Sequence, residues 1–177
     1  REFIQFLESA GVLKFGDFTA KSGRKIPYFI NAGMIKTGND IATLGEFYAR
    51  AYKEKLGDKQ SVLYGPAYKG ISLSVSAAVA LSKKDLNVPF FFNRKEEKDH
   101  GADKGSFLGS KLQDGDRVIM IEDVTTSGKS MEETVPKVKG AADVEIVGLM
   151  VSLNRMEKGL DSDKSALDEI KEKYGFN

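Results

Sequence analysis

Two adjacent carboxylates, Glu122 and Asp123, directly follow a run of apolar residues in the segment RVIMIEDVTTSGKS, residues 117–130. A short run of hydroxyl residues and Gly128 come next, and the pattern then predicts the start of a helix. Backbone N–H groups and hydroxyls at a helix start form a cradle for a phosphate. Paired carboxylates accept hydrogen bonds from vicinal hydroxyls or hold a hydrated Mg²⁺. A phosphate pocket beside a diol pocket predicts a site for a ribose 5-phosphate.

The same segment allows two other interpretations. Its ending SGKS is similar to that of a nucleotide-binding loop of the form G-x-x-x-x-G-K-[ST], but Asp123 stands where that motif needs its first glycine. A carboxylate there would repel the phosphates, which disfavours this interpretation. The second alternative is an ordinary polar turn in which Ser127 and Gly128 only cap the helix, and the segment alone leaves it open.

The elements around this segment predict an α/β fold with a mainly parallel sheet. Short apolar runs without polar alternation, typical of strands buried on both faces, alternate with segments of helical spacing. The expected strands cover residues 61–65, 88–93, 117–121 and 145–155, with two short strands around a turn at 22–23; the expected helices cover residues 1–11, 39–57, 69–84, 161–175 and a stretch from about 129. Ligands of such sheets bind at the carboxyl ends of strands, where Glu122 and Asp123 stand.

Length and composition limit the class of protein. The 177 residues, 41% hydrophobic and 30% charged, predict one domain over residues 1–177. A net charge of +1 gives no general attraction for nucleic acid or an anionic membrane, and no apolar run has the length of a membrane span. We therefore expect neither nucleic acid nor membrane as a partner. The chain has no cysteine, which excludes disulfides and thiol catalysis and favours a cytoplasmic location.

Four segments, in this order, resemble the orotate phosphoribosyltransferases, a family of type I phosphoribosyltransferases. They are FTAKSGRKIPYFINAG, YGPAYKGISL, NRKEEKDHGADKGSFLG and EDVTTSGKS. The resemblance implies a central, mostly parallel sheet flanked by helices, a small N-terminal hood over residues 1–35 and a flexible lid loop over about 94–109. Chains of this family usually continue beyond the position of Asn177 with another strand and helix, so we expect flanking residues there.

The resemblance also implies a reaction and its partners. Orotate and phosphoribosyl diphosphate would give orotidine 5′-monophosphate and pyrophosphate, a step of de novo pyrimidine synthesis that leads to UMP. Mg²⁺ would be held mainly by substrate oxygens and water, so no residue is predicted as a metal ligand. The family further implies a homodimer in which each lid closes over the active site of the partner subunit.

The resemblance implies a large set of contacts to phosphoribosyl diphosphate. The set is Lys21, Tyr68, Lys69, Arg94, Lys95, Lys98, His100, Glu122, Asp123, Val124, Thr125, Thr126, Ser127, Gly128, Lys129 and Ser130. Four of these are expected to be catalytic: Lys69, Lys98, His100 and Asp123. Lys98 would be the main electrostatic contributor in the lid and His100 a proton donor. Without the resemblance, the charged stretch would predict a solvated loop and Lys69 a solvated turn lysine.

The implied orotate site draws on other parts of the chain. Its residues are Lys21, Phe29, Ile30, Thr126 and Arg155. Arg155 would pair with the orotate carboxylate, which suits the geometry of a guanidinium. Relatives often carry two aromatic residues at 29 and 30, so Ile30 departs mildly from the family. Outside the resemblance, both Lys21 and Arg155 would be expected in solvent.

Two other functions remain open at this stage. A phosphoribosyltransferase for a purine or for uracil would keep residues 122–130 but would have little use for Arg155. A non-catalytic sensor of phosphoribosyl diphosphate could dispense with the lid charges and would normally carry an added nucleic-acid-binding element. A nucleotide-binding loop ranks below both. A panel of bases separates the first alternative from the orotate enzyme.

Overall fold

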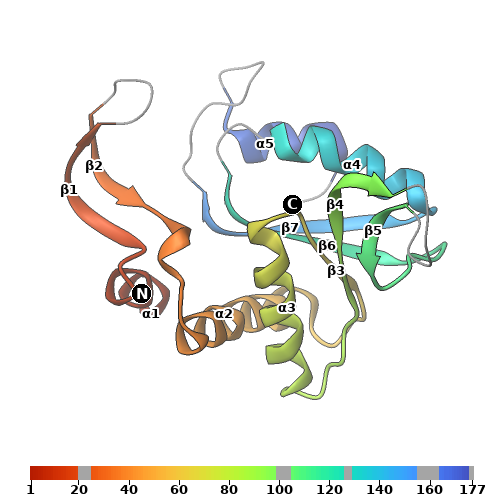
Figure 1. Ribbon diagram of the computed structural model, residues 1–177, viewed down its shortest axis with the longest axis horizontal. Coiled ribbons are helices and arrows are strands. Elements are labelled where there is room, and N and C mark those ends of the chain that lie inside the picture. Colours follow the sequence, from red (N-terminus) through yellow and green to blue (C-terminus); the bar gives the residue numbers. More distant parts are fainter. Residues whose placement is uncertain (20–24, 99–104, 126–128, 155–163, 176–177) are drawn as a thin grey trace.

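The computed structural model describes residues 1–19, 25–98, 105–125, 129–154 and 164–175 (Figure 1). Of residues 95–98, 105, 125, 129 and 130 it describes the backbone alone. At its centre is a sheet of five strands in the order β5-β4-β3-β6-β7. The strands are β3 (Val62–Gly65), β4 (Phe90–Lys98), β5 (Gly105–Gly109), β6 (Arg117–Thr125) and β7 (Glu145–Asn154). All pairs are parallel except β4 with β5, which confirms the predicted mostly parallel α/β sheet.

Helices cover both faces of this sheet (Figure 1). The helices are α2 (Gly38–Leu56) and α3 (Lys69–Ser82) on one face, and α4 (Lys129–Ala141) and α5 (Ala166–Tyr174) on the other. Alternate residues of β6 serve the two layers. Ile119 and Ile121 pack with α2 and α3, whereas Val118 and Met120 pack with α4 and α5. Because both faces of β6 are buried, the strand is apolar at consecutive positions, and this run is what the sequence displays.

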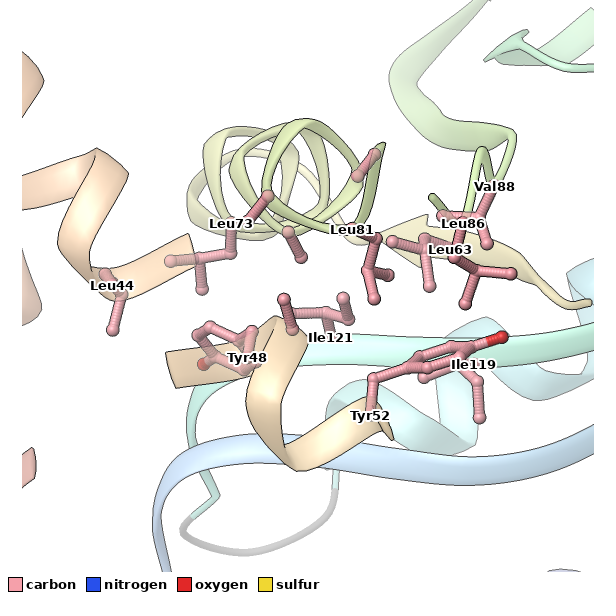
Figure 2. Close-up of a cluster of buried hydrophobic side chains, with 14 residues drawn as sticks. Leu44, Tyr48, Tyr52, Leu63, Leu73, Leu81, Leu86, Val88, Ile119 and Ile121 are labelled. Carbon is pink, nitrogen blue, oxygen red and sulfur yellow. The ribbon is translucent and has the colours of Figure 1, made fainter. Parts of the chain in front are cut away.

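The layer of α2 and α3 is closely packed against the sheet. A Cβ on Gly45 of α2 would lie 2.5 Å from the carbonyl oxygen of Ser76, so the absence of a side chain lets the two helices approach each other. Figure 2 shows the core beneath them, where Tyr48 and Tyr52 of α2 lie beside Ile119 and Ile121 of β6. Closely packed interiors deform little, so this layer supports the ends of the strands that it covers.

The N-terminal residues form a separate small unit beside the main sheet (Figure 1). It comprises α1 (Glu2–Ser9), the antiparallel strands β1 (Leu13–Thr19) and β2 (Lys25–Ile30), and the 3₁₀ helix η1 (Ala32–Met34). Its core is formed by Leu7, Val12 and Leu13. The two predicted strands are thus confirmed, while the predicted turn at residues 22–23 lies outside the described residues.

The polar stretch after the third phenylalanine differs from its prediction. We expected a strand to end at Asn93 and a loop to follow, but β4 continues to Lys98 and pairs antiparallel with β5, Lys98 opposite Gly105. Polar composition shows that a segment is not buried, but backbone hydrogen bonds can still pair it at a sheet edge.

A proline inside a helix predicts a kink or an early end, so we expected Pro136 to kink or shorten the helix that starts near residue 129. α4 contains Pro136 and continues to Ala141, so the helix does not end there. None of the helices described here has both the length and the apolar character that a membrane crossing requires.

Candidate active site

The turn between β3 and α3 depends on two glycines in close contact. A Cβ on Gly70 would lie 2.7 Å from Pro66 Cδ and 3.0 Å from the carbonyl oxygen of Ile121. A Cβ on Gly65 would overlap the carbonyl oxygen of Gly70. Glycine at these positions therefore allows the start of α3 to lie against the ends of β3 and β6. As a result Lys69, the first residue of α3, stands at the carboxyl edge of the parallel strands.

Lys69 forms an ion pair with an acid at the end of the neighbouring strand. Its Nζ lies 3.0 Å from Oδ2 of Asp123 on β6. The Lys69 side chain is 63% exposed and the Asp123 side chain 20%, so the carboxylate is partly withdrawn from water while the ammonium remains open to it. Ion pairs with this exposure stabilise a fold little. The pair therefore contributes little to folding, and the Lys69 ammonium is accessible from solvent.

A cavity of about 290 Å³ lies between the two strand ends. Its lining is Pro66, Ala67, Tyr68, Lys69, Gly70, Glu122, Asp123 and Val124. The structure thus brings together five of the predicted contacts to phosphoribosyl diphosphate, Tyr68 and Lys69 from one segment and Glu122, Asp123 and Val124 from another. A lysine and two carboxylates around one cavity suit a ligand that carries both an anionic group and vicinal hydroxyls.

Asn93 of β4 holds the β3–α3 turn from its other side, and the sequence prediction did not include it. Its Oδ1 accepts hydrogen bonds from the N–H of Ala67 at 2.7 Å and from the hydroxyl of Tyr64 at 3.0 Å, while its Nδ2 donates to the carbonyl of Arg94 at 3.2 Å. Burial raises the pKa of the Tyr64 hydroxyl well above its usual range, so this group remains a donor. A polar residue directly after three phenylalanines was the available signal.

Tyr48 and Ser152 were also missed, and they support the acids from inside the molecule. The Tyr48 hydroxyl donates to the carbonyl oxygen of Glu122 at 2.7 Å and lies 2.7 Å from Ser152 Oγ. The helical spacing of Tyr48 predicts a core residue, and its side chain is indeed buried. No local pattern could reveal the two partners, which lie 74 and 104 positions further along the chain.

The other predicted contacts to phosphoribosyl diphosphate lie along β4, the end of β6 and the start of α4. Arg94 is half-buried next to Asn93. Thr125 is the last residue of β6, and α4 begins at Lys129, so the segment runs from a strand end to a helix start as expected. Backbone alone is described for Lys95, Lys98, Thr125, Lys129 and Ser130. The predicted residues outside the described part of the chain are Lys21, His100, Thr126, Ser127, Gly128 and Arg155.

Two residues of the predicted orotate site lie on β2 and face opposite ways. Phe29 is 42% exposed, and its ring lies against Phe18 with the centroids 5.6 Å apart. Ile30 packs against the small N-terminal core instead. Phe29 is thus the one of the two whose side chain is open to a ligand, and Ile30 could contribute through its backbone. Neither residue lines the cavity between β3 and β6.

The described residues hold no group of three or more His, Cys, Asp or Glu side chains that could enclose a metal ion. Glu122 and Asp123 together could supply part of a coordination shell. Mg²⁺ keeps several waters and binds through one or two carboxylates and substrate phosphates. The side chains present therefore fit a Mg²⁺ ion that enters with an anionic substrate.

The fold and this cavity define a class of protein. A family model described as "Phosphoribosyl transferase domain" matches residues 31–177, and the chain belongs to this family. Within it, the chain is similar to proteins named orotate phosphoribosyltransferase. One from Agathobacter rectalis is 66% identical over 176 residues, covering 99% of this chain and 78% of the relative. One from Clostridium botulinum (strain Alaska E43 / Type E3) is 56% identical over 177 residues, with the same coverage.

A solved structure supports the same relationship. The crystal structure of orotate phosphoribosyltransferase from Francisella tularensis superposes with a TM-score of 0.87 at 38% sequence identity, covering 99% of this chain and 82% of that one. The resemblance inferred from four sequence segments is therefore confirmed over nearly the whole chain. The predicted type I phosphoribosyltransferase fold is confirmed with it.

Proposed function

We propose that this protein transfers the 5-phosphoribosyl group from phosphoribosyl diphosphate to orotate, giving orotidine 5′-monophosphate and pyrophosphate for the synthesis of UMP. The observation that carries the proposal is the cavity at the ends of β3 and β6, where Lys69 faces Asp123. Such a cavity could serve phosphoribosyl transfer to several bases, and the similarity to orotate phosphoribosyltransferases favours orotate among them.

The two acids suit the sugar. As the bond between the anomeric carbon and the pyrophosphate oxygen breaks, positive charge develops on the ribose. Glu122 and Asp123 would accept hydrogen bonds from the ribose hydroxyls, and their negative charge would favour the cationic sugar over the neutral one. The 5′-phosphate would lie in the adjoining strand-to-helix segment, which supplies Thr125, Thr126, Ser127, Gly128, Lys129 and Ser130.

The leaving group requires positive charge. Lys69 would exchange its contact with Asp123 for one with the pyrophosphate, and Tyr68 would line the same end of the cavity. Mg²⁺, when bound through substrate oxygens and water, supplies further neutralisation of the pyrophosphate charge. Lys21, Arg94, Lys95, Lys98 and His100 complete the proposed set around the phosphates, with His100 as proton donor.

The base would bind beside the N-terminal unit. Phe29 offers an exposed ring for the pyrimidine, and Ile30 offers backbone groups. Arg155 follows β7 directly in the chain and would pair with the orotate carboxylate, while Lys21 and Thr126 would lie near the reacting atoms. In this arrangement the base would approach the anomeric carbon from the face opposite the leaving pyrophosphate.

We further propose a homodimer in which the stretch over residues 94–109 acts as a lid on the partner's site. An apolar groove of about 680 Å³ between α2 and α3 supports an association of two copies. Val79 and Tyr68, which are 50% and 70% exposed, both line this groove. Tyr68 also lines the active-site cavity, so a second copy in the groove would lie next to the reacting substrate.

The proposed organisation is a single domain over residues 1–177, in which residues 1–35 form a hood. The separate sheet of β1 and β2, with its own small core, supports this division. We propose a cytoplasmic location, because both substrates are anions that do not cross membranes unaided.

The test is the loss of orotate absorbance on addition of phosphoribosyl diphosphate and Mg²⁺, with parallel assays on uracil, hypoxanthine and adenine. Consumption of orotate alone is the expected result. Turnover of another base would keep the ribose-phosphate site and overturn the assignment of the base. Binding of phosphoribosyl diphosphate without any turnover would favour a sensor over an enzyme.

A further inference from the structure

Tyr48 connects the hydrophobic core to the polar ends of two strands. Its ring belongs to the cluster that includes Leu44, Leu73 and Ile121, and Figure 2 shows it among these side chains. Its hydroxyl reaches out of this cluster to the carbonyl oxygen of Glu122 on β6 and to Ser152 Oγ on β7, at 2.7 Å from each. A rigid element thus contacts the ends of both strands with one polar atom.

The direction of these hydrogen bonds follows from the single proton of a tyrosine hydroxyl. Because Tyr48 donates that proton to the Glu122 carbonyl, the Ser152 hydroxyl must donate to the Tyr48 oxygen. Burial raises the pKa of Tyr48 far above its usual range, and the negative charges of Asp123 and Glu122 raise it further. The Tyr48 hydroxyl is therefore protonated at neutral pH and can donate its hydrogen bond.

The position of this contact matters because β6 is no longer paired with β3 at that point. The pairing of β3 with β6 ends at Met120, whereas β7 pairs with β6 as far as Thr125. Beyond Met120 the sheet holds the strand from one side, and this is the stretch that carries Glu122 and Asp123. The Tyr48 hydroxyl supplies an added anchor at the first of the two acids.

We propose that Tyr48 is a positioning residue for the sugar-binding acids, and that Ser152 acts with it. Through the Glu122 backbone, the two hydroxyls fix where the Glu122 and Asp123 side chains enter the cavity. The inference deepens the proposed function, because it takes the ribose as the ligand of these acids. A small displacement of a catalytic group lowers a rate strongly, so loss of this anchor must appear in the kinetics.

Tyr52 provides a matched control on the same helix. It is also buried, and its hydroxyl also donates to a backbone carbonyl, that of Lys59 at 2.6 Å. Lys59 precedes β3, so this contact lies at the opposite edge of the parallel strands from the cavity. Figure 2 shows the two tyrosine rings at separate places along the core. We expect the loss of either hydroxyl to lower stability by a similar amount. Only the loss of the Tyr48 hydroxyl should displace Glu122 and Asp123.

The experiment compares Tyr48→Phe, Ser152→Ala and Tyr52→Phe in steady-state kinetics and in thermal unfolding. Both Phe variants should lower Tm by a similar amount, about 2–4 °C. Tyr48→Phe and Ser152→Ala should each lower kcat/KM for phosphoribosyl diphosphate by roughly tenfold, the lower end of what supporting contacts contribute, while Tyr52→Phe should keep the parent value. The double variant Tyr48→Phe/Ser152→Ala should lose no more than the worse single variant, since both act through one chain of hydrogen bonds.

Equal kinetics in Tyr48→Phe and Tyr52→Phe would overturn the proposal. If the parent protein does not consume orotate, the proposed function fails, and the positioning role is then decided by calorimetric titration of phosphoribosyl diphosphate with Mg²⁺. Weaker binding in Tyr48→Phe and Ser152→Ala, with unchanged binding in Tyr52→Phe, supports the role. Equal binding in all variants rejects it.

Discussion

Lys69 Nζ and Asp123 Oδ2 lie 3.0 Å apart and join the first residue of α3 to the end of β6. In the proposed reaction the two groups serve different parts of one substrate, the pyrophosphate and the ribose. Their contact keeps both side chains at the cavity. To displace this contact, the substrate must offer Lys69 anionic oxygens that accept its hydrogen bond at least as strongly as the Asp123 carboxylate does.

Replacing Lys69 should affect the rate of the reaction but not the stability of the fold. We expect Lys69→Ala to lower kcat by roughly 10²-fold, because a cation aimed at developing negative charge is lost, and to change the free energy of unfolding by less than about 1 kcal/mol. Lys173→Ala is the control, since Lys173 forms a similar exposed ion pair with Glu132 at 2.6 Å, away from the cavity. Initial rates and urea unfolding of both variants give the answer. A normal kcat in Lys69→Ala would remove the lysine from the mechanism.

Two of the helix glycines, Gly70 and Gly140, should respond oppositely to replacement by alanine. A Cβ on Gly70 would meet Pro66 and Ile121 within 3.0 Å, so Gly70→Ala should cost roughly 1–3 kcal/mol of stability and displace the turn. Among the described residues, no atom lies within 4 Å of a Cβ built on Gly140, so Gly140→Ala should stabilise α4 by about 0.5–1 kcal/mol. Urea unfolding measures both. Tolerance of alanine at 70 would show that the start of α3 can move away from the sheet.

Sequence alone predicted the layers of this fold well, for a physical reason. Burial on both faces forces consecutive apolar residues in β6, and helix packing forces the spacing that runs through α2 to its end before Gly57. These are properties of single segments. The predicted strand β4 was too short because pairing with β5 satisfies backbone groups without leaving an apolar pattern.

The site could be predicted only where its residues lie at the ends of such segments. Lys69, Glu122 and Asp123 follow buried strands, and their types indicate chemistry. Tyr48 and Asn93 could not be assigned in the same way, because their roles depend on partners that topology alone brings close. A buried tyrosine in a helix predicts a core position whether or not its hydroxyl reaches an active site.

Loss of the Asn93 side-chain amide should lower kcat more than loss of the Tyr64 hydroxyl, which donates to the same amide. Asn93→Ala leaves the Ala67 N–H without its acceptor, which should cost about 1–3 kcal/mol and loosen the turn that carries Tyr68 and Lys69. Tyr64→Phe removes the other hydrogen bond to Asn93 but keeps the one to Ala67. We therefore expect a clearly lower kcat in Asn93→Ala than in Tyr64→Phe. The reverse order would mean that the core, and not the amide, fixes the turn.

Buried tyrosines should make the protein sensitive to alkali. Burial raises the pKa of Tyr48 and of Tyr64 in the folded state, whereas in the unfolded chain each titrates near its ordinary value of about 10. The contribution of these two protonated tyrosines to the free energy of unfolding is thus complete below about pH 10. It is lost as the pH rises further, because the unfolded chain releases these protons at a lower pH than the folded chain does. The decline should approach about 1.4 kcal/mol per pH unit for each tyrosine. Urea unfolding between neutral pH and pH 11 should show a shallower decline in Tyr48→Phe/Tyr64→Phe; an unchanged decline would contradict the argument.

Lys98 should affect the rate more than the binding of either substrate. Its proposed contact strengthens as the pyrophosphate departs, so Lys98→Ala should lower kcat by far more than it raises KM for orotate or phosphoribosyl diphosphate. Lys55→Ala on α2, an exposed residue that does not line the cavity, is the control of equal charge change and should keep the parent kcat. Steady-state kinetics decide the matter, and a normal kcat with a raised KM would reduce Lys98 to a binding residue.

Mixed dimers test whether the lid acts across the subunit boundary. If Lys98 of one subunit completes the site that holds Asp123 of the other, a heterodimer of Lys98→Ala and Asp123→Asn subunits has one site with both defects and one with neither. Such a heterodimer, isolated by two different affinity tags, should recover up to half of the activity of the parent dimer, while each homodimer remains impaired. A lid that acts within its own subunit would leave one defect in every site, because neither subunit is intact. Verified heterodimers without recovered activity would therefore place Lys98 over its own cavity. Recovered activity would support the proposed site shared by two chains.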